Sequence, residues 1–170
     1  MVVDDEKMNL ELMEGILESL GHVCVSTDSA RTCYERLTGS IDLILMDVMM
    51  PGTDGFEAVR YIRNFTTFSD LPIIMVTSLS SKQDRLIAVE CGANDFISKP
   101  VDRTELRIRI SALLKLKRAQ DSIKQNQSEL EKRVKERTSE LRAALETAAD
   151  ANQRIYSIHL DTIRRLASAA

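Results

Sequence analysis

Ile41-Asp42-Leu43-Ile44-Leu45-Met46 is a nearly continuous apolar run with Asp47 directly behind it, and it determines the fold class. Strands buried on both faces of a parallel sheet have this composition. On either side of it, four further short runs read as strands, and segments of helical spacing fill the gaps between them. The expected strands are residues 1–3, 22–26, 41–46, 72–76 and 95–98, and the expected helices are residues 8–20, 29–37, 55–64, 82–90 and 104–116.

This alternation of strand and helix defines the architecture. Parallel neighbours in a sheet need a crossover connection, and such βαβ crossovers are right-handed. We therefore predict an α/β fold, a five-stranded doubly wound parallel sheet with helices on both faces.

The composition divides the chain near residue 100. Residues 1–100 carry a net charge of −8, all six glycines and all three prolines, whereas residues 101–170 carry +5 and neither Gly nor Pro. Gly and Pro interrupt helices, so their absence permits an unbroken helix. We predict a compact acidic domain over residues 1–118 and a long C-terminal helical extension over residues 119–170. A surplus of five positive charges is too small to indicate nucleic-acid binding.

The composition also excludes several classes of protein. With 44% hydrophobic and 29% charged residues, the chain has enough apolar material for a packed core. No run approaches the roughly 18 apolar residues of a membrane span, and the acidic residues that begin at Asp4 do not fit a secretory leader. Cys24, Cys33 and Cys91 lack metal-binding spacing and are expected to be reduced. We expect a cytoplasmic protein with no membrane partner.

Polar residues follow the expected strands at the point where each strand ends. Ligands of open parallel sheets bind at this carboxyl edge. Three carboxylates gathered there require a cation, and oxygen ligands without Cys or His favour Mg²⁺ or Mn²⁺. A carboxylate beside such an ion, an ammonium and a hydroxyl is equipped to accept a phosphoryl group. The residues in question are Asp4 and Asp5, Asp47, Thr77 and Lys99.

Four segments that contain these residues resemble the receiver domain of two-component response regulators. The resemblance covers residues 1–118, and all five functional positions occur in order. The segments are Val2-Val3-Asp4-Asp5-Glu6, Leu45-Met46-Asp47-Val48-Met49-Met50-Pro51-Gly52-Thr53-Asp54-Gly55, Val76-Thr77-Ser78 and Gly92-Ala93-Asn94-Asp95-Phe96-Ile97-Ser98-Lys99-Pro100.

The resemblance implies a flavodoxin-like receiver fold in which Asp47 is phosphorylated by a sensor histidine kinase or phosphotransfer protein, with Thr77 and Lys99 as catalytic partners. It also implies a Mg²⁺ ion held by Asp5, Asp47 and the Met49 carbonyl, with Asp4 bound through water. Thr77 and Phe96 would be the switch pair, and Lys99–Pro100 a cis peptide. Family members usually have two or three more apolar residues before the aspartate pair, so we expect a shortened first strand and a chain cut from a longer protein.

Two other functions remain open for these residues. One is a receiver-like interaction module that is never phosphorylated. The other is a Mg²⁺-dependent phosphohydrolase of related fold, although such enzymes usually have a second aspartate where this chain has Met49. Asp54–Gly55 is interpreted as turn and helix-cap chemistry. His159 is not expected to be a kinase phosphoacceptor, because no acidic residue directly follows it.

Met49 and Leu79 occupy two positions that border the phosphoryl group in the receiver family. Neither side chain can orient a water molecule by hydrogen bonding, and both can shield the phosphoryl group with apolar bulk. A preorganised polar group can lower a hydrolysis barrier by a few kcal/mol, and each ~1.4 kcal/mol is about tenfold in rate. We predict slow self-dephosphorylation.

The extension carries residues spaced at alternating steps of three and four, the heptad pattern of a coiled coil, with a stutter between Val134 and Thr138. A long polar helix frays unless it is paired. We predict a parallel homodimer through a coiled coil; the alternative is a solvated helix folded back on the receiver. The expected seam consists of Ile123, Gln127, Leu130, Val134, Thr138, Leu141, Leu145, Ala148, Asn152, Ile155 and His159.

The last residues suggest what the extension leads to. Residues 129–141 resemble linkers that precede output domains in signalling proteins, and residues 162–170 are similar to the entry helix of HD-GYP domains, which hydrolyse cyclic di-GMP. We expect the chain itself to have no activity beyond its own phosphorylation and dephosphorylation. The output missing from it would be a cyclic di-GMP phosphodiesterase, with a diguanylate cyclase or a phosphatase as alternatives.

Overall fold

The computed structural model describes residues 1–78, 87 and 90–168, with side chains as far as Tyr156. The chain divides into two units, Met1–Gln120 and Asp121–Ala170.

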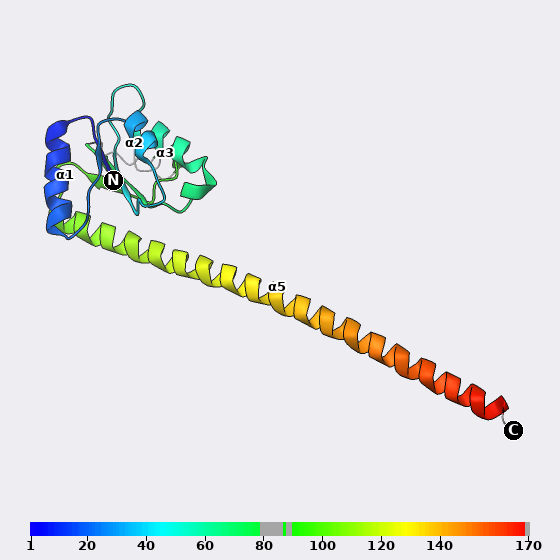
Figure 1. Ribbon diagram of the computed structural model, residues 1–170. Helices are drawn as coiled ribbons and strands as arrows, with labels where there is room; N and C mark the ends of the chain where they lie inside the picture. Colours follow the sequence, from blue (N-terminus) through cyan, green and yellow to red (C-terminus); the bar gives the residue numbers. More distant parts are fainter. Residues whose placement is uncertain (79–86, 88–89, 169–170) are drawn as a thin grey trace. The chain divides into compact units, whose positions relative to one another are not determined.

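The first unit is built on a five-stranded parallel sheet, and this confirms the predicted fold class (Figure 1). The strand order is β2-β1-β3-β4-β5, so the direction of winding reverses between β1 and β3. Ligands of doubly wound sheets bind at such a reversal. The strands are β1 (Val2–Val3), β2 (Ser26–Thr27), β3 (Ile44–Asp47), β4 (Ile73–Thr77) and β5 (Asp95–Ser98).

Two strands begin three or four residues later than the sequence predicts. β2 starts at Ser26 instead of His22, because its neighbour β1 offers only Val2 and Val3 for pairing, opposite Ser26 and Thr27. Val23, which lies within the predicted strand, is 95% exposed. β3 starts at Ile44 instead of Ile41, where its pairing with β4 also begins. The apolar runs locate these strands, but the partner strands set their bounds.

Helices cover both faces of the sheet. α1 (Lys7–Ser19) and the first turns of α5 (Arg103–Ser168) share a core with the β-strand residues of one face. α2 (Ala30–Arg36) and α3 (Gly55–Arg63) share a second core with those of the other face, and the 3₁₀ turn η1 (Thr66–Phe68) follows α3. Neighbouring strand residues alternate between the two cores: Ile44 and Met46 belong to one, and Leu45 to the other. The predicted helix over residues 82–90 lies outside the described residues except for Ile87 and Glu90.

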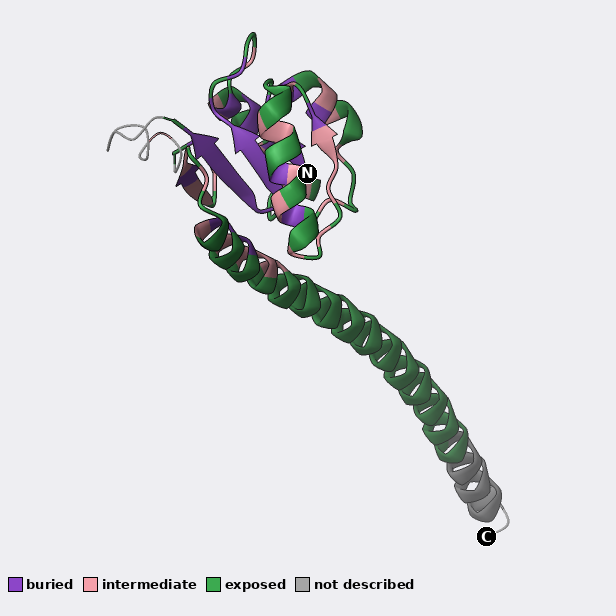
Figure 2. Ribbon diagram, turned by 90° about the vertical axis from the view of Figure 1, so that its left-hand side faces the viewer, coloured by how far each residue is buried: buried purple, intermediate pink, exposed green. Residues whose placement is uncertain are grey.

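The second unit is the continuation of α5, which confirms the predicted long helix. Every residue from Asp121 to Tyr156 is exposed (Figure 2). The helix contains no Gly or Pro.

The start of α3 lies directly against the end of β3. Asp54 caps the helix, since its Oδ1 accepts a hydrogen bond of 2.7 Å from the Glu57 amide, and this confirms the interpretation of Asp54 as a cap. The Gly55 amide donates to the Val48 carbonyl at 3.0 Å. A Cβ atom on Gly55 would lie 2.1 Å from the Asp47 carbonyl oxygen and 2.9 Å from the Val48 Cα. Only glycine fits here, because the obstacle is backbone.

We predict that Gly55→Ala lowers the free energy of unfolding by about 2 kcal/mol, the usual cost of forcing extra atoms into a packed region. Gly15→Ala is the matched control, because Gly15 lies inside α1 with no atom within 4 Å of an added Cβ. This control should instead gain about 1 kcal/mol from helix propensity. Urea unfolding of the full chain measures both values. Equal effects of the two substitutions would contradict the steric explanation.

Candidate functional site

The strand register brings the predicted polar residues to one edge of the sheet. Val3 of β1 pairs with Met46 of β3, so Asp4 and Asp47 follow side by side. Thr77 of β4 pairs with Ser98 of β5, and the Lys99 amide donates to the Thr77 carbonyl at 2.7 Å. Asp4, Asp47 and Thr77 are buried, although each carries a polar or charged side chain. Burial of such groups requires partners.

Lys99 supplies the partner of the two buried carboxylates. Its Nζ lies 2.8 Å from Oδ2 of Asp4 and 2.9 Å from Oδ1 of Asp47. The lysine is itself only partly exposed. One ammonium group therefore joins the ends of β1, β3 and β5. Hydrogen bonds between charged groups of this kind are among the strongest in proteins.

Asp4 is held by two further donors. Its Oδ1 accepts a hydrogen bond from the Glu6 amide at 2.9 Å and another from Asn9 Nδ2, also at 2.9 Å. Sequence reasoning missed Asn9, which lies in the first turn of α1. The sequence offers one indication of this role: an asparagine, whose amide group can donate hydrogen bonds, stands near the start of a helix, and an aspartate pair comes just before that helix. The two bonds fix the orientation of the Asp4 carboxylate.

Three carboxylates form an acidic cluster at this edge. Asp4, Asp5 and Asp47 each offer an oxygen, and these oxygens lie within 4.8 Å of one another. Asp5 is exposed, whereas the other two are buried. Lys99 balances only one of the negative charges. Because all the donors are hard oxygens, the cluster fits a small divalent cation such as Mg²⁺.

The surroundings shift the pKa values of the buried pair. Burial raises the pKa of Asp47 above its usual value, and the hydrogen bond and charge of Lys99 oppose that rise. Burial alone would lower the pKa of Lys99, but its hydrogen bonds to Asp4 and Asp47 outweigh that effect, so the pKa is raised. The lysine is therefore firmly cationic, and its charge favours the ionised, nucleophilic form of Asp47.

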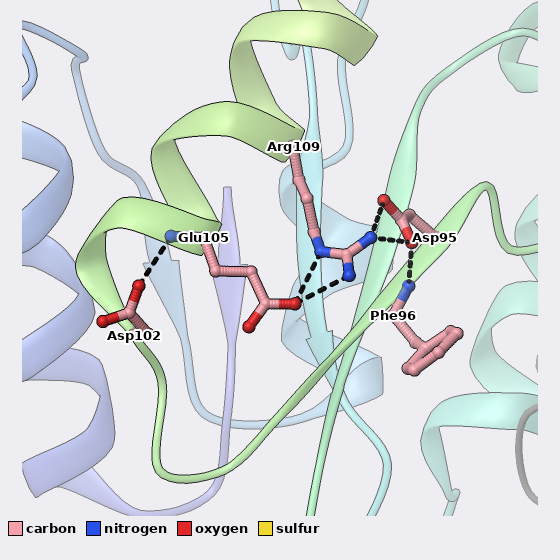
Figure 3. Close-up of polar contacts among 5 residues, drawn as sticks. All are labelled: Asp95, Phe96, Asp102, Glu105 and Arg109. Atoms are coloured by element: carbon pink, nitrogen blue, oxygen red, sulfur yellow. Dashed lines mark hydrogen bonds and ion pairs between the residues drawn. The ribbon is translucent and has the colours of Figure 1, made fainter.

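The structure also describes two other predicted residues, Phe96 and Met49. Phe96 is half-buried in β5, opposite Met75 of β4, and its amide donates to Asp95 Oδ1 at 2.8 Å (Figure 3). Met49 is 60% exposed. Leu79 lies outside the described residues. The Lys99–Pro100 peptide is cis, as the resemblance implied.

Comparison with known proteins fits this geometry. Residues 1–111 match the family model of the response regulator receiver domain. The chain belongs to the response regulator receiver family. Among solved structures, the receiver domain of a signal transduction histidine kinase from Syntrophus aciditrophicus is 33% identical, with a TM-score of 0.61 over 67% of this chain and 87% of that one. The BeF₃-activated DrrB receiver domain is 29% identical, with a TM-score of 0.61 over 67% and 94%.

Curated relatives of this receiver are longer proteins. Response regulator PleD of Caulobacter vibrioides is 33% identical over 129 residues, which make up 75% of this chain and 28% of PleD. The cyclic di-GMP phosphodiesterase response regulator RpfG of Xanthomonas campestris is 36% identical over 137 residues, 79% of this chain and 36% of RpfG. The chain thus spans about a third of the length of these relatives. Among the residues that the structure describes, no helix has the length and apolar character needed to cross a membrane.

Proposed function

We propose that this receiver is a phosphorylation switch with two functional parts. Residues 1–118 accept a phosphoryl group on Asp47 from the histidine of a sensor kinase or phosphotransfer protein, and residues 119–170 transmit the change as a dimeric helical linker. The observation that carries the proposal is the ammonium group of Lys99, which lies 2.9 Å from a buried Asp47 carboxylate inside an acidic cluster.

The residues divide the chemistry among them. An oxygen of Asp47 attacks the phosphorus of the donor, so that an O–P bond forms while the P–N bond to the donor histidine breaks. The electron pair stays on the imidazole nitrogen, which takes up a proton. Lys99 stabilises negative charge on the phosphoryl oxygens by its ammonium group, and the Thr77 hydroxyl donates to one of them. Thr77 ends β4 and Lys99 directly follows β5, and these neighbouring strands bring the two residues together, since the Lys99 amide donates to the Thr77 carbonyl.

A divalent cation completes this site in the proposal. Asp5, Asp47 and the Met49 carbonyl would hold Mg²⁺ directly, and Asp4 would hold it through water. When bound, Mg²⁺ neutralises the charge of the phosphoryl oxygens. The acidic cluster supports this assignment, because Lys99 leaves part of its negative charge unbalanced.

We predict that Asp47→Ala abolishes labelling by acetyl phosphate in the presence of Mg²⁺, measured as intact mass. Asp42→Ala is the control, since Asp42 is an exposed acid just before the same strand, and it should label normally. Lys99→Ala should retain some labelling but lose any change in shape, because the cationic partner of the phosphoryl oxygen is absent. Label retained on the Asp47→Ala chain would refute the assignment of the acceptor.

The lifetime of the phosphorylated state should depend on Met49. We predict that Met49→Asn shortens it by about tenfold, because an amide can orient the attacking water molecule. Met49→Leu, which keeps the position apolar, should leave the lifetime unchanged. The measurement is the loss of phosphorylated mass after acetyl phosphate is removed by desalting. A lifetime that both substitutions leave unaltered would mean that this side chain does not limit hydrolysis.

The exposed apolar residues of α5 support the proposed homodimer. Along residues 121–156, large apolar side chains at the predicted seam positions are more than half exposed in the single chain. A helix that leaves such a stripe in water gains stability by burying it against a second helix. The residues are Ile123, Leu130, Val134, Leu141, Leu145 and Ile155.

We predict that Leu141→Glu raises the dissociation constant of the dimer by about a hundredfold or more, since each dimer loses two buried leucines and gains two buried charges. Lys135→Glu, on the same helix but off the seam, should leave the dimer intact. Sedimentation velocity over a concentration series separates the two outcomes. If the Leu141→Glu chain dimerises like the unaltered one, the proposed seam is wrong.

The linker would pass the signal to an output domain outside this chain. RpfG, whose name describes a cyclic di-GMP phosphodiesterase response regulator, aligns over 137 residues and therefore beyond the receiver domain itself. This extended match supports a cyclic di-GMP phosphodiesterase as the output.

A further inference from the structure

Arg109 links helix α5 to strand β5, and every nitrogen of its guanidinium group donates a hydrogen bond to an acidic side chain (Figure 3). Nη1 donates to both carboxylate oxygens of Asp95, each at 2.7 Å. Nε and Nη2 donate to Oε1 of Glu105, one turn earlier on α5, at 2.9 and 2.7 Å. The guanidinium is thus fixed between an acid of β5 and an acid of its own helix.

The acids that hold Arg109 are themselves fixed. Asp95 Oδ1 also accepts a hydrogen bond from the Phe96 amide at 2.8 Å. The Glu105 amide donates to Asp102 Oδ1 at 2.8 Å, which caps the start of α5. Five residues therefore form one connected polar network from the helix cap to the backbone of Phe96, as Figure 3 shows.

The same guanidinium contacts the aromatic ring of Phe96. Its Cζ lies 5.8 Å from the ring centroid, within the range at which a cation is attracted by the ring electrons. Arg109 therefore connects Phe96 to α5 in two ways. It contacts the ring directly, and it hydrogen-bonds to Asp95, which accepts a hydrogen bond from the Phe96 amide.

We propose that Arg109 is a positioning residue that stabilises the resting position of the Phe96 ring and so couples this position to helix α5. The inference rests on the proposed function, in which Phe96 is a switch residue. Because the contact exists in the unphosphorylated chain, a movement that carries the ring away from the guanidinium on phosphorylation would break it. α5 then loses one of its contacts with β5, and the loss of this contact raises the free energy of the phosphorylated state.

The coupling can be measured with beryllofluoride, which mimics the phosphoryl group on an aspartate. The full-length chain is titrated at saturating Mg²⁺, and bound beryllofluoride is read by ¹⁹F NMR. Arg109→Met should tighten the apparent dissociation constant about two- to fivefold, the effect of losing one partly exposed cation–aromatic contact. Arg107→Met is the matched control, because Arg107 is an exposed arginine two residues away on the same helix, and it should bind like the unaltered chain.

A second background separates positioning from general loosening of the fold. In a Phe96→Leu chain the ring contact is absent, so adding Arg109→Met should change beryllofluoride binding by less than twofold. An effect of Arg109→Met that persists in that background, or that is absent or reversed in the unaltered one, would overturn the coupling. Intact-mass labelling of Asp47 by acetyl phosphate is followed in parallel. If the unaltered chain neither labels nor binds beryllofluoride, the proposed function fails and the inference with it; if it does both and Arg109→Met has no effect, the inference alone fails.

Discussion

The ammonium group of Lys99, shared between two acids, holds the candidate site together. It joins two carboxylates that are almost fully buried, Asp4 and Asp47, at 2.8 and 2.9 Å. Removing one partner from a buried ion pair leaves an uncompensated charge, which is strongly destabilising. The three residues follow or end three different strands, so these ion pairs form only if the parallel register of β1, β3 and β5 is correct. The sheet therefore positions the groups that carry the chemistry.

The chain that follows Lys99 connects the same site to the helix that we propose as the transmitter. β5 supplies Phe96 and leads into Lys99, and α5 begins at Arg103 after the cis Lys99–Pro100 peptide. Leu106 and Ile110 of α5 are buried in the sheet core, while Arg109 between them contacts Asp95. A change at the phosphoacceptor has only a few residues to cross before it reaches α5. This proximity is the physical basis of the signal transmission that we propose.

The sequence predicts the sheet and the residues at its edge for one reason: buried parallel strands are apolar throughout, so their polar ends stand out. Asp47 after a continuous apolar run is the clearest case. Strand bounds are less predictable, because the length of β2 depends on pairing with Val2 and Val3 rather than on its own residues. The roles of Asn9 and Arg109 depend on distances between separate elements, which no local pattern encodes. The steric need for glycine at position 55 likewise arises from the approach of another segment's backbone.

The identity of the acceptor can be tested directly, because we propose that the carboxylate of Asp47, beside Lys99, forms the acyl phosphate. Sodium borohydride reduces an aspartyl phosphate to the alcohol and leaves homoserine at the acceptor position, and peptide mass mapping then locates that position. After treatment with acetyl phosphate and Mg²⁺, we expect reduction of Asp47 and of no other residue. Reduction at Asp4 or Asp5, or of no aspartate at all in a chain that carries the phosphoryl mass, would contradict the assignment.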